Sequence, residues 1–309
     1  MAAVTEDARE QQLAWEAVQR PRAAVAAILS AFLTIAGYMW AGIALRDAPS
    51  AGWLESLGQA GQDDPIGRLP SQKLATYEYY QDHALTLIGS GIVRALALLA
   101  LAWVVTFIAA ATRARKPEFI RLAVYITLVG AVLYAISTVL GPIGTVLAID
   151  DFLDGARTVD DARDIGGSTL LIAASLIGQL GPLAVVAGLL LVSLNAMRVG
   201  LLTRFLGILG VISAVLMILP LMPLPIVQSF WLVGVGLLLL GVGRVGLPPA
   251  WRTGNAEPWP TAMEGAQRRR SAEERKQGIT RDKPEPEPTP APAGRAHPSS
   301  RKRKRKRRD

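Results

Sequence analysis

The sequence predicts an all-α integral membrane protein, a polytopic bundle of about six transmembrane helices followed by a disordered basic tail. Of its 309 residues, 51% are hydrophobic and only 19% are charged, which is too apolar for a soluble protein of this size. The apolar residues form continuous runs, whereas membrane β-strands show alternation in short segments. We therefore expect an N-terminal arm at 1–22, a transmembrane domain at 23–246 and a tail at 247–309.

Six runs approach the roughly 20 apolar residues that a helix needs to cross the hydrocarbon core. In chain order they lie in Ala23–Leu45, Ala84–Thr112, Phe119 to about Leu140, Gly166–Met197, and twice within Phe205–Gly243. Gly141-Pro142 is expected to end or bend the third helix. Prolines near the middle of Phe205–Gly243 divide it into two helices. The first run is too long, and begins too late, for a cleaved signal peptide.

The connections between these runs alternate in charge. Basic residues collect before the first run, after the second and after the fourth, whereas residues 46–82 and 142–165 carry six acids each. Short basic loops face the cytosol, so 46–82 and 142–165 are expected to be extracytoplasmic. Both termini of this multi-pass cell-membrane protein are then cytosolic, which requires an even number of spans.

Arg94 is the most informative candidate functional residue, because a charge within a transmembrane span is costly and is seldom present without a function. If the second helix enters the membrane at Ala84, Arg94 lies near mid-membrane and needs a carboxylate or a water-filled cavity. If the helix protrudes outward, together with Tyr77, Tyr79 and Tyr80, Arg94 can reach the interface instead. Asp150 and Asp151 are candidate charge partners, or else solvated loop acids.

Two further polar residues, Gln179 and Asn195, lie in the fourth run. They either form hydrogen bonds between helices or contribute to a substrate pathway. The chain has no cysteine and only two histidines, His83 and His297. Because it also has no phosphate-binding loop and no metal-ligand spacing, we predict no catalytic residue, no cofactor and no metal site, and enzymatic function is disfavoured.

The tail carries the net charge of the protein. Residues 247–309 contain 17 Lys and Arg against 8 Asp and Glu, and a Pro-rich segment predicts disorder. The chain ends in eight consecutive cations: Arg301, Lys302, Arg303, Lys304, Arg305, Lys306, Arg307 and Arg308. Such a run binds anionic lipid headgroups beside a membrane or RNA phosphates, or serves only topology and solubility.

The stretch from Arg198 to Ile212, RVGLLTRFLGILGVI, places a basic turn before a helix rich in small residues. It resembles six-span bacterial membrane proteins that carry a leucine, basic, aromatic-leucine-glycine turn. The composition and the Pro-Pro-Ala-Trp after the last run look actinobacterial. This resemblance implies the architecture and no catalytic residue. We expect a non-enzymatic scaffold or recruitment protein acting through its tail. The alternatives are a small transporter or channel-like protein with a pathway near Arg94, and an insertase-like protein that contacts ribosomes.

Overall fold

The computed structural model of the protein describes residues 6–50, 68–119, 121–219, 225–242, 246–259 and 270. The chain divides into two compact units, Met1–Trp259 and Pro260–Asp309. Only Arg270 is described in the second unit, so the account below concerns the first. The predicted basic run at 301–308 lies outside the described residues.

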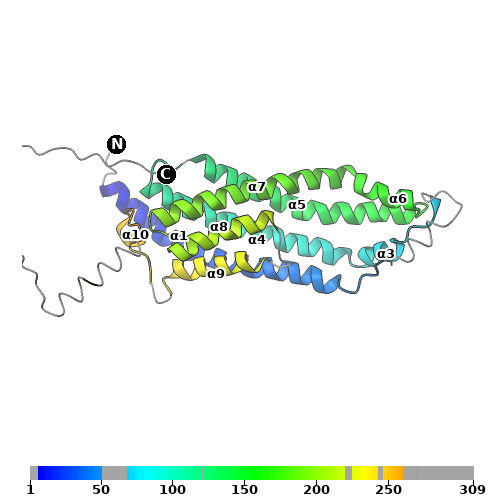
Figure 1. Ribbon diagram of the computed structural model, residues 1–309, viewed down its shortest axis with the longest axis horizontal. Helices are drawn as coiled ribbons and strands as arrows, with labels where there is room; N and C mark the ends of the chain where they lie inside the picture. Colours follow the sequence, from blue (N-terminus) through cyan, green and yellow to red (C-terminus); the bar gives the residue numbers. More distant parts are fainter. Residues whose placement is uncertain are drawn as a thin grey trace, which may run out of the picture. The chain divides into compact units, whose positions relative to one another are not determined.

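The first unit is a bundle of helices in which successive helices pack side by side (Figure 1). Its elements are α1 (Glu6–Ala44), α3 (Leu74–Asp82), α4 (Ala84–Arg115), α5 (Arg121–Asp154), α6 (Val159–Asp164), a short 3-10 turn (Ile165–Gly167), α7 (Thr169–Arg198), α8 (Arg204–Ile218), α9 (Ile226–Leu240) and α10 (Ala250–Thr253). α1 packs on α4, α4 on α5, α5 on α7, α7 on α8 and α8 on α9. Since α9 also packs on α1, the six helices close into a ring.

Two helices extend further than the hydropathy pattern indicated. α1 begins at Glu6 and includes most of the expected N-terminal arm; Glu6 and Asp7 in its first turn complement the helix dipole. α5 continues through Pro142 to Asp154, which corrects the expected loop at 142–165. Pro142 cannot donate to the Thr138 carbonyl. That carbonyl instead lies close against Gly91 of α4, so packing supports the helix across the proline.

Among the described residues, four helices are long and apolar enough to cross a membrane, namely α1, α4, α5 and α7. α8 and α9 are apolar but contain 15 residues each, or about 22 Å of helix. The two-helix interpretation of Phe205–Gly243 is confirmed. Six spans were expected, but the described residues contain four long helices, because the last two apolar runs form the shorter α8 and α9.

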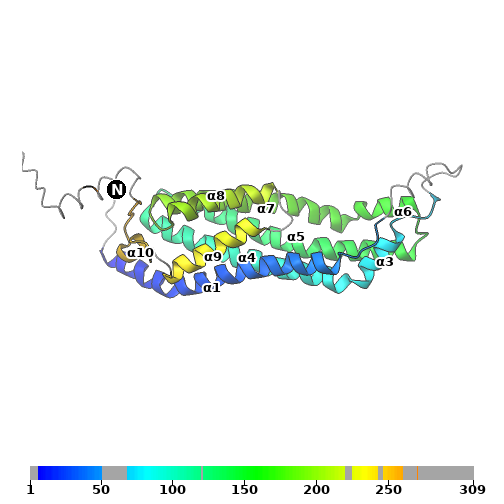
Figure 2. The same ribbon diagram turned by 60° about the horizontal axis from the view of Figure 1, so that its bottom comes forward.

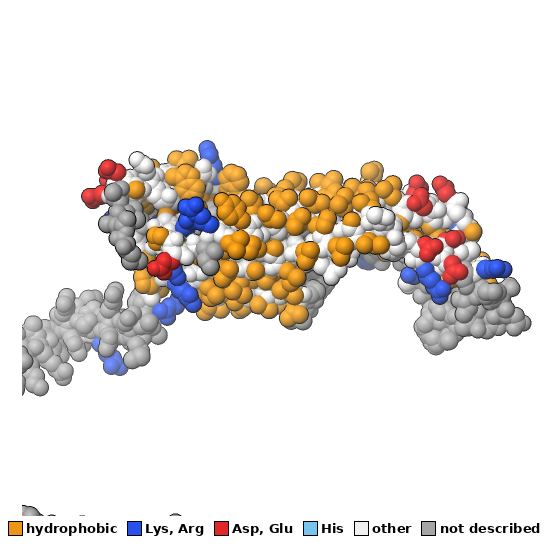
Figure 3. Space-filling model, turned by 90° about the horizontal axis from the view of Figure 1, so that it is seen from above, with side chains coloured by type: hydrophobic (Ala, Val, Ile, Leu, Met, Phe, Trp, Pro, Cys, Tyr) orange, Lys and Arg blue, Asp and Glu red, His pale blue; other side chains and the backbone are white. Residues whose placement is uncertain are grey.

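Charged side chains gather at the two ends of the bundle, with an apolar belt between them (Figure 3). We call the end where Arg113, Lys116, Arg121, Arg198 and Arg204 lie the basic end, and the end formed by α3 and α6 the acidic end. Along α5 exposed apolar side chains run from Leu122 to Ile136, and Leu147 is exposed further along.

Short α3 carries the three clustered tyrosines as a separate helix beyond α4. The Tyr79 hydroxyl donates to the Ala44 carbonyl at 2.8 Å, which ties α3 to the end of α1. Tyr77 packs edge-on against Phe152 of α5, with ring centroids 5.1 Å apart. Burial there raises the pKa of Tyr77, with Tyr80 as a smaller cause. The three tyrosines thus lie on a short helix of their own, separated from α4 at His83.

Small residues set the register between α5 and α7. A Cβ at Gly181 would lie 2.7 Å from the Tyr134 nitrogen, and one at Gly144 would lie 3.0 Å from Leu171. A Cβ at Gly188 would overlap the Thr127 hydroxyl. In these three pairs, moving a given number of residues forward along α5 corresponds to moving the same number backward along α7. This is the register of two antiparallel helices packed closely on glycine.

We expect Gly188→Ala to destabilise the protein by about 1–3 kcal/mol, because the new methyl group would force α5 and α7 apart. The matched control is Gly141→Ala, also within a helix, where a Cβ would meet nothing within 4 Å. That change should be neutral or slightly stabilising, as alanine favours helix. Unfolding in detergent micelles measures both, and equal effects would contradict the packing described.

Candidate ligand-binding site

Arg94 of α4 points into the bundle toward α1. Its side chain passes over Gly37, where a Cβ would lie 2.7 Å from Arg94 Cγ. Its Cζ lies 5.3 Å from the centroid of the Tyr38 ring, within the range of a cation–π interaction. The absence of a side chain at Gly37 thus gives the arginine its path.

Tyr134 of α5 completes a cluster with these two side chains. Its hydroxyl lies close enough to Tyr38 and Arg94 to interact electrostatically with both. α1 and α5 are not neighbours in the ring of helices, so Tyr38 and Tyr134 meet in the interior of the bundle. We call Tyr38, Arg94 and Tyr134 the Arg94 cluster.

The Arg94 cluster lacks a counterion among the described residues. None of the ion pairs in that part of the chain involves Arg94. Its Nε donates to the Ser90 carbonyl at 3.4 Å, a long contact. A guanidinium stays charged in proteins and presents five donors, so most of this hydrogen-bonding capacity is available to a ligand.

The structure does not bring Asp150 and Asp151 to Arg94. Both side chains are exposed near the end of α5, and Asp150 accepts a hydrogen bond from Gln81 Nε2 at 2.9 Å. Gln81 precedes α4, and Arg94 follows Ala84 by ten residues, or about 15 Å along the helix. The two carboxylates therefore lie at the acidic end, well away from the cluster.

Gln179 lies at the level of the cluster. Gly181 packs on the Tyr134 backbone, and Gln179 is two residues, or about 3 Å, further along α7. It is exposed and donates to the Ser175 hydroxyl at 3.3 Å. Gln179 precedes Met197 by 18 residues, which is five turns, so the two share one face of α7.

That shared face is covered by α8 only near the basic end. Met197 contacts Gly207, and Ser193 contacts Gly210. If the same register continues to the end of α8, Ile218 lies level with Val185 of α7. Val185 is six residues from Gln179, so α8 ends about 9 Å before the level of Gln179. α8 and α9 accordingly stop partway along the bundle (Figure 2).

Beyond that point the described helices no longer close the ring. α1 and α7 do not pack against each other in the described part of the chain. Gln179 is exposed because the helix that covers its face elsewhere has ended. The sequence-predicted pair Arg94 and Gln179 therefore lies at one level, on the open stretch of the bundle.

Asn195 does not belong to this site. Its Oδ1 accepts a hydrogen bond from Lys116 Nζ at 3.2 Å, and its Nδ2 donates to the Leu191 carbonyl at 2.8 Å. Asn195 lies 16 residues from Gln179, about 24 Å along α7. It connects α7 to the end of α4 at the basic end.

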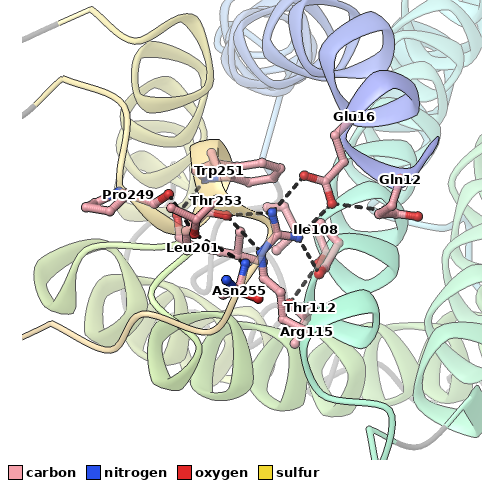
Figure 4. Close-up of polar contacts among 12 residues, drawn as sticks. Gln12, Glu16, Ile108, Thr112, Arg115, Leu201, Pro249, Trp251, Thr253 and Asn255 are labelled. Carbon is pink, nitrogen blue, oxygen red and sulfur yellow. Dashed lines mark hydrogen bonds and ion pairs between the residues drawn. The ribbon is translucent and has the colours of Figure 1, made fainter. Parts of the chain in front are cut away.

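An ion pair that sequence reasoning missed closes the basic end (Figure 4). Arg115 Nη1 and Nη2 donate to the two Glu16 carboxylate oxygens at 2.6 and 2.8 Å. The side chains are 0% and 3% exposed. The partners are 99 residues apart, and no local pattern links an arm residue to one arginine among several in a basic loop.

The chain after α9 completes this closure. The Ala250 carbonyl accepts from Arg115 Nε at 3.1 Å and from Nη2 at 2.7 Å. Trp251 lies under the guanidinium, stacks on Phe107, and donates from Nε1 to the Leu201 carbonyl. We call Glu16, Arg115, Ala250 and Trp251 the basic-end clamp, since they join α1, α4, α10 and the turn after α7.

Glu16→Gln should lower the free energy of unfolding by about 3–5 kcal/mol, because it leaves the Arg115 charge buried without its partner. Glu10→Gln, at an exposed position of the same helix, should change stability by less than about 0.5 kcal/mol. Thermal unfolding of the purified protein in detergent compares the two variants. A Glu16→Gln protein as stable as the control would show that the pair is not a structural one.

Comparison with known proteins adds no assignment to this site. No family model, no curated protein and no solved structure matches the chain.

Proposed function

We propose that this chain is a membrane carrier that binds an anionic solute at the Arg94 cluster. In this proposal α1, α4, α5 and α7 cross the membrane, and α8 and α9 form a hairpin that enters it from the basic end. Both termini are then cytosolic, and the acidic end faces outward. The observation that carries it is a half-buried arginine, beside Tyr38, with no carboxylate partner in the described residues. An intramembrane charge is costly and marks a functional site by default.

The depth of the cluster supports this proposal. Tyr134 is 12 residues from Leu122 and 13 from Leu147, the first and last exposed apolar residues of α5. The cluster is thus about 18–20 Å from either edge of the apolar belt. A cation held there gains from an anionic ligand more than a surface cation would, because the surrounding dielectric is low.

The two halves of the bundle differ in a way that suits a carrier open on one side. Toward the basic end the interior is filled with fully buried side chains, including Leu101, Ile108, Leu189, Trp231 and Leu232. The basic-end clamp lies beyond them. Carriers expose one central site to the two sides of the membrane in turn, and this arrangement corresponds to a site closed on the basic side.

Cysteine accessibility tests the proposed site, because the chain contains no cysteine of its own. In Gln179→Cys, an anionic membrane-impermeant thiosulfonate added outside intact cells should react. Its rate relative to that of its cationic counterpart should fall several-fold when Arg94→Gln is added, since the local positive charge is lost. The acidic end is the same in both proteins, so its effect cancels from this comparison.

The control is Leu180→Cys, the neighbouring position, where the side chain is 63% exposed on the belt. It should remain unlabelled because a charged reagent does not enter hydrocarbon. The proposed anion site fails if Gln179→Cys is unreactive from outside, or if Arg94→Gln leaves the ratio of the two rates unchanged.

If the protein is a carrier, weakening the basic-end clamp should make the Arg94 cluster accessible from the basic side. Combined with Gln179→Cys, the Glu16→Gln change should allow an impermeant reagent added to inside-out vesicles to reach residue 179, because closure of the basic end is weakened. Glu10→Gln should leave that side closed. If labelling from the basic side is equally absent in both backgrounds while labelling from the acidic side persists, the site binds without alternating.

A second candidate function rests on the eight consecutive cations at 301–308. Such a run attracts anionic headgroups at about 1 kcal/mol per charge, and recruitment through it is independent of Arg94. Deleting 301–309 should then abolish salt-sensitive binding to RNA or to anionic vesicles, while Arg94→Gln leaves it unchanged. An unchanged salt-sensitive interaction after the deletion would remove this candidate.

A further inference from the structure

The charge around the opening restricts which anions can approach from water. The described residues at the acidic end include nine carboxylates, Asp47, Glu78, Asp82, Asp150, Asp151, Asp154, Asp160, Asp161 and Asp164, against five cations, Arg46, Arg68, Lys73, Arg157 and Arg163. Three of these cations are already paired with acids there. The net negative rim repels a small hydrated anion from the aqueous side.

The side of the bundle offers a different approach. Between α1 and α7 the ring is open beyond the end of α8, inside the apolar belt. Leu176 and Leu183 flank Gln179 on the surface of α7, and they are 59% and 50% exposed. A polar group at Gln179 is therefore bordered by apolar surface that suits a hydrocarbon chain.

The first turn of α9 lies at the level of Arg94 along the bundle. Gly236 packs on Ala24 and Ile28 of α1. Ten residues back along antiparallel α9, Ile226 lies level with positions 34–38 of α1, where Tyr38 and the Arg94 side chain lie. The amino end of a helix carries a partial positive charge, so this end favours an anion at the same level as the guanidinium.

We propose that the ligand of the Arg94 cluster is an amphiphile with an anionic headgroup and an apolar chain, which enters from the bilayer between α1 and α7. The headgroup binds the free donors of Arg94, with Tyr38, Tyr134 and Gln179 in reach at the same level. The chain lies along the exposed leucines of α7. This inference rests on the proposed anion-binding function and names the class of its substrate.

Three probes separate the headgroup from the chain. Lysophosphatidylglycerol has both features, lysophosphatidylcholine has a similar chain with a zwitterionic headgroup, and glycerol phosphate has an anionic headgroup with no chain. The full-length protein, purified in a neutral detergent, is titrated with each and examined by native mass spectrometry. Protection of Gln179→Cys from the anionic thiosulfonate is measured in parallel.

We expect lysophosphatidylglycerol to bind and protect at least tenfold more strongly than either other probe. Arg94→Gln should reduce its affinity to that of lysophosphatidylcholine, whereas Arg121→Gln, an exposed cation at the basic end, should not. Arg94→Lys keeps the charge and should retain part of the preference, which distinguishes loss of charge from loss of folding.

The outcomes also separate this inference from the function beneath it. Equal protection by glycerol phosphate overturns the amphiphile inference and leaves an anion site open to water. Equal protection by lysophosphatidylcholine shows apolar binding without headgroup recognition and overturns it as well. If Gln179→Cys is unreactive before any probe is added, the proposed function itself fails.

Discussion

The arrangement of the bundle depends on a difference in length between its two short helices, α8 and α9, and the helices against which they pack. α8 and α9 have 15 residues each, whereas the helices they pack against, α7 and α1, have 30 and 39. Near the basic end the short pair closes the ring, and the interior there is buried around Trp231 and Leu232. In the described chain α1 and α7 do not pack directly against each other, although α4 contacts both. The pair stops near the level of Arg94 and Gln179, so the length of two helices decides whether these two polar side chains are covered.

Close packing on glycine brings these polar residues to a common level. Gly37 leaves room for the Arg94 side chain, and Gly181 lets α7 approach the backbone of Tyr134. A shift of one helical turn is about 5.4 Å and would separate Arg94 from Gln179. These glycines thus determine both the distance between neighbouring helices and their register. The register decides which side chains lie at the level of Arg94.

Much of this fold could be predicted from the sequence, because hydropathy depends on local composition. The helical class, the α4 and α7 boundaries to within a few residues, and the division near the prolines before α9 follow from it. The passage of α5 through Pro142 did not, because a tertiary contact with Gly91 supports it. Arg94 and Gln179 could be singled out as polar residues in apolar runs, but their common level could not. The Glu16–Arg115 ion pair could not be predicted either, because its two residues are 99 positions apart in the sequence and come together only through tertiary packing.

Two arginines of α4 show how hydrogen bonding separates a structural role from a binding role. Arg115 donates to both Glu16 oxygens, twice to Ala250 and once to Ala111, so its whole guanidinium is satisfied by protein. Its removal would break the clamp, and it has nothing left to offer a ligand. Arg94 has one long bond to Ser90 and an aromatic ring beside it. A charge within an apolar belt is costly unless something completes its hydrogen bonding. In the proposed function that completion comes from a ligand that arrives between α1 and α7.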